Sequence, residues 1–92
     1  MDQLRAMRIF VRVAERGSLS AASVDLGLAR GAASAIMSDL ERYLGVQLLE
    51  RSTRSLRLTD DGRHYLERAR SILADVESLE DEVGGAERQP RG

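Results

Sequence analysis

The sequence predicts a mainly α-helical fold: a winged helix-turn-helix of three helices and a two-stranded wing, followed by a long dimerisation helix. Three observations lead to this prediction. Two amphipathic segments are separated by a three-residue turn that begins with Gly27, which is the spacing of a helix-turn-helix. Two short strand-like segments with a polar link follow them. An apolar heptad repeat then runs through residues 65–83.

The first helix is expected from Leu4 to Glu15, because apolar residues recur there at helical spacing and arginines occupy the opposite face. Its expected apolar stripe is Leu4, Met7, Phe10, Val11 and Ala14. A second short helix is expected at about residues 21–26, with Ser18 or Ser20 as its N-cap. Both serines are also candidates for contact with a DNA phosphate, although capping alone would account for them.

The third helix is expected over about residues 30–44 and ends before Gly45. It is the candidate recognition helix, whose N-terminal side chains reach base edges in a helix-turn-helix. Arg30, expected in its first turn, is able to bind guanine O6 and N7; a phosphate contact or a solvated arginine is the alternative. Three more residues of this helix complete the candidate DNA-binding set on it: Gly31, Ser34 and Ser38.

The wing is expected from residues 46–51 and 56–58, which have strand-like character and flank a polar link. It supplies four further candidates for DNA binding: Arg51, Thr53, Arg54 and Arg57. Arg54, at the tip, is expected in a minor groove, where the negative potential is concentrated; a free surface side chain is the alternative. Arg51 and Arg57 are expected to hold phosphates, with Arg51 equally suited to a structural ion pair.

A helix of about 24 residues, about 36 Å long, is expected after Thr59, which would cap it. A head of 58 residues is too small to cover the apolar stripe of such a helix, so a second copy of the chain is expected to cover it. Packing on the chain's own winged domain is the alternative. The expected dimerisation residues are Tyr65, Ala69, Ile72, Val76, Leu79 and Val83. The domain organisation predicted is residues 1–58, the DNA-binding domain; 59–84, the dimerisation helix; and 85–92, an open linker.

The charge is unevenly divided along the chain. Residues 1–58 hold nine arginines and six acids, whereas residues 59–92 hold five arginines and nine acids. The basic excess therefore lies where DNA contact is expected. All 14 basic residues are arginine, which favours bidentate contact with phosphate and guanine, although a GC-rich genome produces the same usage.

The composition excludes most chemistry. Cysteine is absent and His64 is the single histidine, so no metal site, no cofactor and no enzymatic activity are expected. The first residues are charged and no long apolar run follows them, so neither a secretory signal nor a membrane span is expected. These features predict a cytoplasmic protein.

Three blocks of the sequence, residues 10–22, 40–51 and 56–62, resemble the LysR-type transcriptional regulators, in one register over about residues 2–83. The resemblance implies a bacterial regulator that binds double-stranded promoter DNA as a homodimer or tetramer. It also implies that linker helices pair the subunits and that a separate C-terminal domain binds a small-molecule effector. Residues 85–92 are then expected to lead towards that effector-binding domain, which this chain lacks.

One block departs from the family pattern. The family usually has Ser-Gln-Pro-Ala-Leu-Ser-Arg-Gln at the head of the recognition helix. In this chain Ala29 replaces the capping serine, Gly31 the proline and Ala35 the arginine, while Ser34 matches the family's serine. Loss of the cap costs about 1 kcal/mol, and the base-facing side is nearly bare. This departure supports a second hypothesis, a protein-interaction module whose DNA-binding face has decayed and whose coiled coil holds two copies together.

Overall fold

The computed structural model describes residues 1–52 and 55–84. Within them, four helices and one antiparallel pair of strands follow in the order α1 (Gln3–Arg16), α2 (Leu19–Asp25), α3 (Ala32–Leu44), β1 (Leu49–Arg51), β2 (Leu56–Leu58) and α4 (Asp60–Gly84). The predicted mainly α fold, with three helices, a two-stranded wing and a long last helix, is confirmed. Thr53, Arg54 and the expected linker 85–92 lie outside the described residues.

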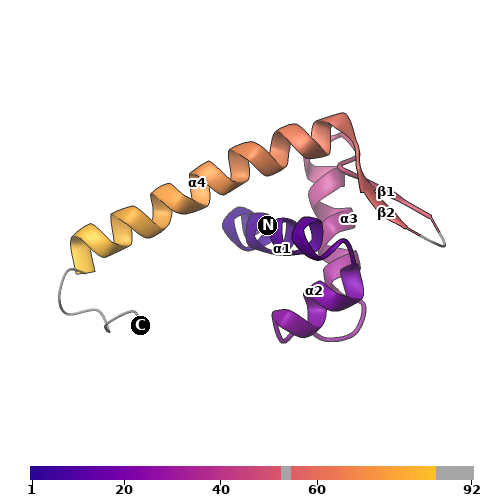
Figure 1. The fold of residues 1–92 in the computed structure, drawn as a ribbon, viewed down its shortest axis with the longest axis horizontal. Coiled ribbons are helices and arrows are strands. Elements are labelled where there is room, and N and C mark those ends of the chain that lie inside the picture. The colour runs from indigo at the N-terminus through magenta and orange to yellow at the C-terminus, as the bar shows by residue number, and fades with distance from the viewer. Residues whose placement is uncertain (53–54, 85–92) are drawn as a thin grey trace.

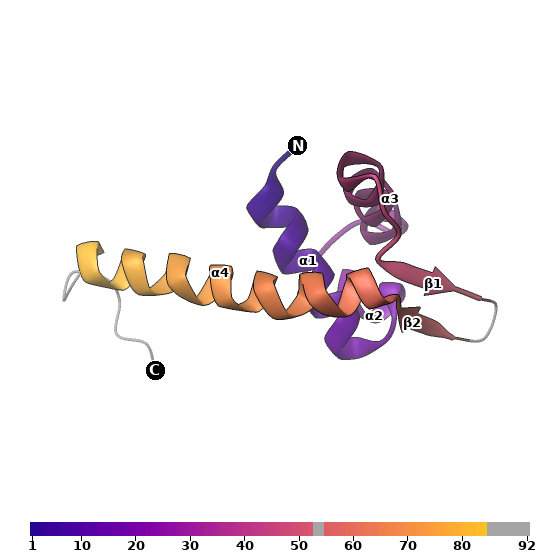
Figure 2. The same cartoon turned by 90° about the horizontal axis from the view of Figure 1, so that it is seen from above.

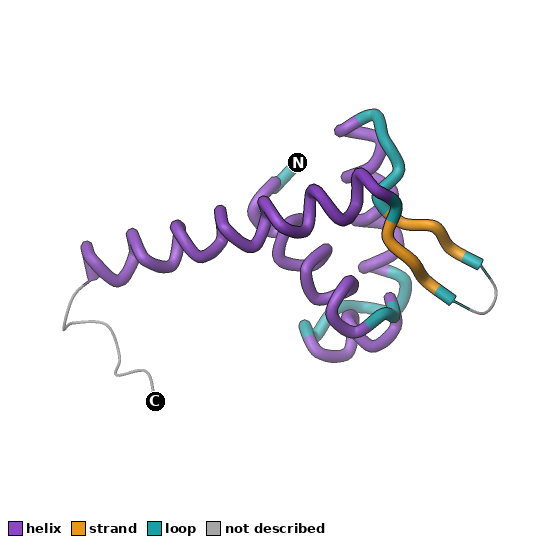
Figure 3. The backbone as a smooth tube through the Cα atoms, turned by 45° about the horizontal axis from the view of Figure 1, so that its top comes forward, coloured by secondary structure: helices purple, strands orange, loops and turns teal. Residues whose placement is uncertain are grey.

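The first three helices pack together, and α1 contacts all the other helices (Figure 1). The first half of α4 crosses α1, whereas its second half extends away from the rest of the molecule (Figure 2). The β1–β2 hairpin projects from the opposite end (Figure 3). The two functions expected from the sequence, DNA contact and dimerisation, are therefore assigned to opposite ends of the molecule.

The core forms where α1, α3 and the segment entering β1 meet. Its largest fully buried side chains are Phe10, Val13, Met37, Leu40 and Leu48. On α1 the buried face is Ala6, Ile9, Phe10 and Val13, which is rotated from the stripe expected from the sequence. Leu4 is 37% exposed, and the two faces share only Phe10. The rotation arises because α1 is covered from more than one side, by α2, α3 and α4.

Two element boundaries differ from the prediction. The second helix begins at Leu19, two residues early, because the hydroxyl of Ser18 accepts from the amide of Ala21 and caps it at that point. The first strand begins at Leu49, three residues late. The amides of Leu48 and Leu49 donate to the Glu41 carboxylate, which holds the segment before β1 against α3, and the strand pairing begins with Leu49 opposite Leu58.

The junction between the wing and α4 is built around Thr59. Its hydroxyl donates to the carbonyl of Gln47 at 2.7 Å and accepts from the amide of Gly62 at 2.9 Å. The predicted capping role of Thr59 is therefore confirmed. The Thr59 amide also donates to the carbonyl of Leu48 at 3.0 Å. Gly62 lies against that same carbonyl, so closely that a Cβ at this position would overlap the oxygen. The junction therefore requires glycine.

Replacing Gly62 with alanine is expected to lower the free energy of unfolding by about 3 kcal/mol, because the added methyl meets backbone that no side-chain rotation can relieve. Urea denaturation followed by circular dichroism measures the change. Arg68→Ala, on an exposed position of the same helix, is the control and should stay within about 0.5 kcal/mol of the parent. Equal stability of the two variants would contradict the close packing at Leu48.

Candidate nucleic-acid interface

The candidate interface begins at the N-terminus of α2. The side chain of Ser18 is occupied as the N-cap of this helix, with its hydroxyl 3.1 Å from the amide of Ala21. Ser20 lies in the first turn of α2 and is exposed. The two serines, which the sequence left equivalent, therefore differ: Ser18 shapes the helix end, and Ser20 presents a hydroxyl to solvent.

The turn between α2 and α3 places Arg30 differently from the prediction. Helix α3 begins at Ala32, so Arg30 lies in the turn before the helix and not in its first turn. Gly31 is the N-cap residue, with φ +81°, a left-handed conformation that glycine adopts without strain, and no side chain caps the helix. Ala29, at the family's capping position, has no hydrogen-bonding side chain. The helix therefore starts two residues late.

The side chains of α3 that follow are small. Ser34 and Ser38 are half-buried, and Ala35 is exposed. Asp39 is exposed and forms an ion pair with Arg42, one turn along the same helix, at 2.9 Å. This pair neutralises the charge of Asp39, but it also occupies the guanidinium of Arg42.

In the wing, Leu49 pairs with Leu58, Glu50 with Arg57 and Arg51 with Leu56. The hairpin is closed by the Ser52 amide, which donates to the Ser55 carbonyl at 2.9 Å. Arg57 is exposed, with the carboxylate of Glu50 opposite it across the ladder. The wing-tip candidates Thr53 and Arg54 lie outside the described residues.

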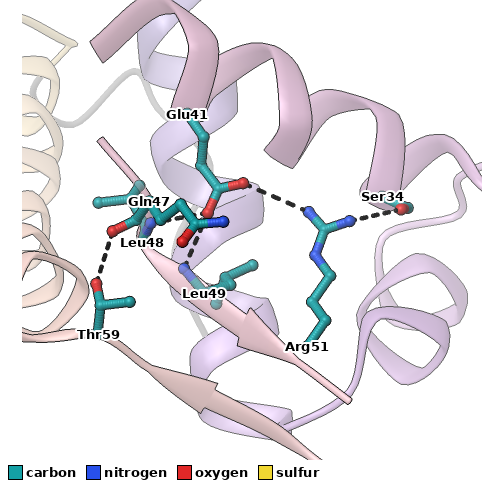
Figure 4. Close-up of polar contacts among 7 residues, drawn as sticks. All are labelled: Ser34, Glu41, Gln47, Leu48, Leu49, Arg51 and Thr59. Atoms are coloured by element: carbon teal, nitrogen blue, oxygen red, sulfur yellow. Dashed lines mark hydrogen bonds and ion pairs between the residues drawn. The ribbon is translucent and has the colours of Figure 1, made fainter. Parts of the chain in front are cut away.

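Arg51 bridges the wing and α3 (Figure 4). Its guanidinium donates to the Ser34 hydroxyl at 3.2 Å and forms an ion pair with Glu41 at 3.8 Å. Of the two roles that the sequence left open for Arg51, the structure contains the ion pair. The same Glu41 carboxylate accepts from the amides of Leu48 and Leu49, at 2.7 and 2.9 Å. Glu41 therefore ties the recognition helix to the wing.

Sequence reasoning missed Glu41 as part of the site. One signal was available, since it is an acid near the end of the third helix, seven and eight residues before the two amides that it binds. However, nothing in the local pattern distinguishes such an acid from the solvated ones, because its partners are backbone amides that only the fold brings within reach.

The candidate dimerisation residues divide into two groups along α4. Tyr65 packs edge-to-face on Phe10, with ring centroids 5.2 Å apart, and burial raises the pKa of its phenol. Ala69 is 2% exposed. These two therefore already have neighbours within their own chain, as the alternative interpretation of the stripe supposed. Ile72 and Val76 are half-buried, and the last two of the set are more open, with exposed fractions of 58% and 81% for Leu79 and Val83.

The described residues form neither a metal site nor a membrane-spanning helix. No cluster of three or more histidine, cysteine, aspartate or glutamate side chains in that part of the chain is placed to hold a metal ion. None of its helices has both the length and the apolar character needed to cross a membrane.

The chain is similar to proteins of one family. The family model described as bacterial regulatory helix-turn-helix protein, lysR family, matches residues 4–63. An HTH-type transcriptional repressor of Pseudomonas aeruginosa is 42% identical over 92 residues, all of this chain and 29% of the relative. The HTH-type transcriptional regulator CrgA of Neisseria meningitidis is 42% identical over 86 residues, 94% of this chain and 29% of the relative. This chain thus spans under a third of the length of these relatives.

Solved structures with the same fold include complexes with DNA. The crystal structure of the CbnR DBD–DNA complex matches with a TM-score of 0.85 and 39% identity, over 92% of this chain and 98% of that chain. The BenM DBD/catB site 1 DNA complex matches with a TM-score of 0.86 and 31% identity, over 96% of this chain and 98% of that chain. At these identities the likeness concerns sequence as well as fold.

A double-mutant cycle tests the link between α3 and the wing. Glu41→Ala should lower the free energy of unfolding by about 2–3 kcal/mol, because two amides lose their shared acceptor. Arg51→Ala should cost less, and the coupling between the two changes should be about 0.5–1 kcal/mol, since both side chains are partly exposed. Urea denaturation of the four proteins measures the coupling. Glu50→Ala, on the exposed side of β1, is the control. A coupling of zero would show that the ion pair between Arg51 and Glu41 does not contribute to stability.

Proposed function

Because this chain belongs to the LysR family of bacterial helix-turn-helix regulators, we propose that it binds double-stranded promoter DNA in a sequence-specific way, as a homodimer. The observation that carries the proposal is the match with the CbnR DBD–DNA complex, which extends over nearly all of both chains at 39% identity. The basic excess of residues 1–58 agrees with it. The role is that of a regulator and not of an enzyme.

The DNA-binding surface that we propose consists of the N-terminus of α2, the turn before α3, the outer side of α3 and the wing. Arg30 is an exposed cation of the helix-turn-helix, and no ion pair joins it to another described residue. It would bind a guanine edge, with Gly31 letting the backbone approach the groove. Hydroxyls and arginines around it would contact phosphates and neighbouring bases: Ser18, Ser20, Ser34, Ser38, Arg51 and Arg57. We include Thr53 and Arg54 in this set because of their position in the sequence of the wing.

The dimer that we propose is formed by the second half of α4, where Ile72, Val76, Leu79 and Val83 leave an apolar stripe open. Tyr65 and Ala69, at the start of the stripe, would hold the helix in place on its own domain. Five acids and no base follow Arg70 in this helix. Two helices paired in opposite directions would set this acidic end against the partner's arginine-bearing half, which favours the antiparallel arrangement.

Several parts of the proposal concern the whole protein. The division into residues 1–58 for DNA contact, 59–84 for pairing and 85–92 as a linker is proposed on the sequence. We also propose that a C-terminal domain outside this chain binds a small-molecule effector, that pairs of dimers form tetramers, and that the protein acts in the cytoplasm, where promoter DNA lies.

The second candidate function is a protein-interaction module. Two observations favour it: the guanidinium of Arg51 is already occupied by Glu41 and Ser34, and the outer side of α3 carries only small side chains before Asp39. A module of this kind would bind a partner protein through the same face and would show no affinity for a duplex.

Selection of the chain on a randomised duplex pool separates the two functions. A two-fold symmetric site is expected for the DNA-binding dimer. Affinity for that site should fall roughly 10³–10⁵-fold between 50 and 200 mM salt, if 6–10 phosphates are contacted. Recovery of no enriched sequence, together with no salt-dependent binding to any duplex, would reject DNA binding and leave the interaction module.

Replacing Arg30 with alanine should relax the base preference at one or two positions of each half-site, where a guanine contact supplies about 1–3 kcal/mol of discrimination. Repeating the selection with the variant measures this. Arg8→Ala removes the same charge from an exposed position of α1 and should leave the selected site unchanged. An identical site from the Arg30 variant would show that Arg30 reads no base.

Aspartate at both Ile72 and Val76 should convert the dimer to a monomer, because it places two charges in the apolar stripe of each helix. Sedimentation equilibrium measures the mass. The control carries the same added charge on the opposite side of α4, as Ser71→Asp with Ser78→Asp, and should remain a dimer. A dimer in both cases would place the pairing surface elsewhere.

A further inference from the structure

A groove of about 560 Å³ lies between α2 and α3. It is open to solvent, and both helices and the turn between them line it. We call it the α2–α3 groove, and its main lining residues are Leu19, Ser23, Val24, Leu28, Arg30 and Ser34. This volume is within the range of small-molecule sites in proteins. Neither the sequence nor the family resemblance predicted a cavity in this place.

The interior of the groove is mostly apolar. Leu19 and Leu28 are half-buried around it, and Val24 is 79% exposed, the most exposed large apolar side chain of the first three helices. A DNA phosphate would contact the rim, but a charged group gains nothing from an apolar wall. The groove therefore suits a ligand that has an apolar body.

One polar side chain, Ser23, lies in the mostly apolar lining of the groove. Ser23 is only 8% exposed and lines the groove, yet no hydrogen bond joins its hydroxyl to another residue in the part of the chain that the structure describes. The neighbouring Ser18 and Ser34 differ, because the first caps α2 and the second accepts from Arg51. No buried side-chain polar atom of the described residues lacks a hydrogen-bond partner, so the Ser23 hydroxyl keeps access to solvent through the groove and is within reach of a ligand that enters it.

The rim of the groove is positive. Arg30 lines it, and no carboxylate among the described residues is paired with this arginine. The N-terminus of α3 opens beside it, with Gly31 as an N-cap that supplies no side-chain acceptor. The first amides of a helix and its dipole both favour an anion at this end. The charge at the rim thus selects an anionic group, and the interior selects an apolar one.

We propose that the α2–α3 groove binds a small organic carboxylate with a flat apolar body. The carboxylate lies against Arg30 and the N-terminus of α3, and the body packs on Leu19, Val24 and Leu28. A hydroxyl at the far end of the body exchanges a hydrogen bond with Ser23. Because Arg30 and Ser34 also belong to the proposed DNA-binding surface, an occupied groove excludes the duplex; this consequence, unlike the binding itself, rests on the proposed function.

Titration of the ¹⁵N-labelled chain with 6-hydroxy-2-naphthoate, without DNA, tests the site. Saturable shifts are expected for the amides of Ser20, Ser23, Val24 and Ser34, with a Kd of about 1 mM, as suits a ligand of this size. Absence of saturation up to about 20 mM, or saturable shifts confined to α4, would overturn the proposal.

Matched variants and ligands test the two polar contacts. Arg30→Gln should weaken the naphthoate at least about fivefold, whereas Arg8→Gln, on α1 and outside the groove, should not change its Kd. The neutral 6-hydroxy-2-naphthamide should bind the parent and the Arg30 variant equally. Ser23→Ala should abolish the preference for the hydroxylated acid over 2-naphthoate. Equal binding of the acid to all variants would overturn the assigned orientation.

A second titration addresses DNA. In the presence of 10 mM naphthoate, the Kd of the parent for its selected duplex should rise about tenfold, as simple competition requires. An unchanged duplex affinity with a filled groove would refute the exclusion and leave the binding site intact. Failure to bind any duplex would reject the proposed function. The titration without DNA would still show whether the α2–α3 groove binds the naphthoate.

Discussion

The side chain, the amide and the carbonyl of Leu48 each contact a different part of the molecule. The relative positions of α3, the wing and α4 depend on these contacts. Its side chain is 1% exposed in the core, and its amide donates to Glu41 of α3. Its carbonyl accepts from the amide of Thr59 and lies against Gly62 of α4. A buried amide or carbonyl without a partner is costly, so each of these contacts restricts where the neighbouring elements can lie. One residue thereby connects the recognition helix, the hairpin and the long helix.

This arrangement makes the two ends of α3 unlike each other. Its C-terminal half is fixed to the wing through Glu41, which serves two amides and the guanidinium of Arg51. Its N-terminal end has no side-chain cap and follows the left-handed Gly31. The part of the helix that sets the angle of the wing is therefore tightly held. The N-terminal part is held instead by the buried side chains of Ala33 and Met37 and by the bond from Arg51 to Ser34.

The sequence predicted the order and type of every element, because apolar periodicity and the capping residues Ser18 and Thr59 are local signals. The features it missed depend on residues brought together by folding. The late start of α3 follows from a φ of +81° at Gly31, which the residue type permits but does not require. The role of Glu41 depends on two backbone amides, and the packing of Tyr65 on Phe10 on a crossing of two helices. The α2–α3 groove is defined by side chains from two helices that no periodic pattern relates.

The crossing of α4 over α1 links the orientation of the apolar stripe on α4 to the position of the first three helices. Tyr65 packs against the core that includes buried residues of α3, Ala69 is buried, and Arg70 forms an ion pair with Glu15 of α1 at 3.5 Å. The apolar stripe beyond them continues on the same rigid helix, whose successive residues differ in direction by about 100°. The direction in which Ile72 and Val76 face is therefore set by the packing of the first half of α4, which carries Tyr65 and Ala69, on α1. A second helix docked on the stripe, as we propose, would therefore meet it in one orientation relative to α3, since α4 cannot turn without breaking the contact between Tyr65 and Phe10.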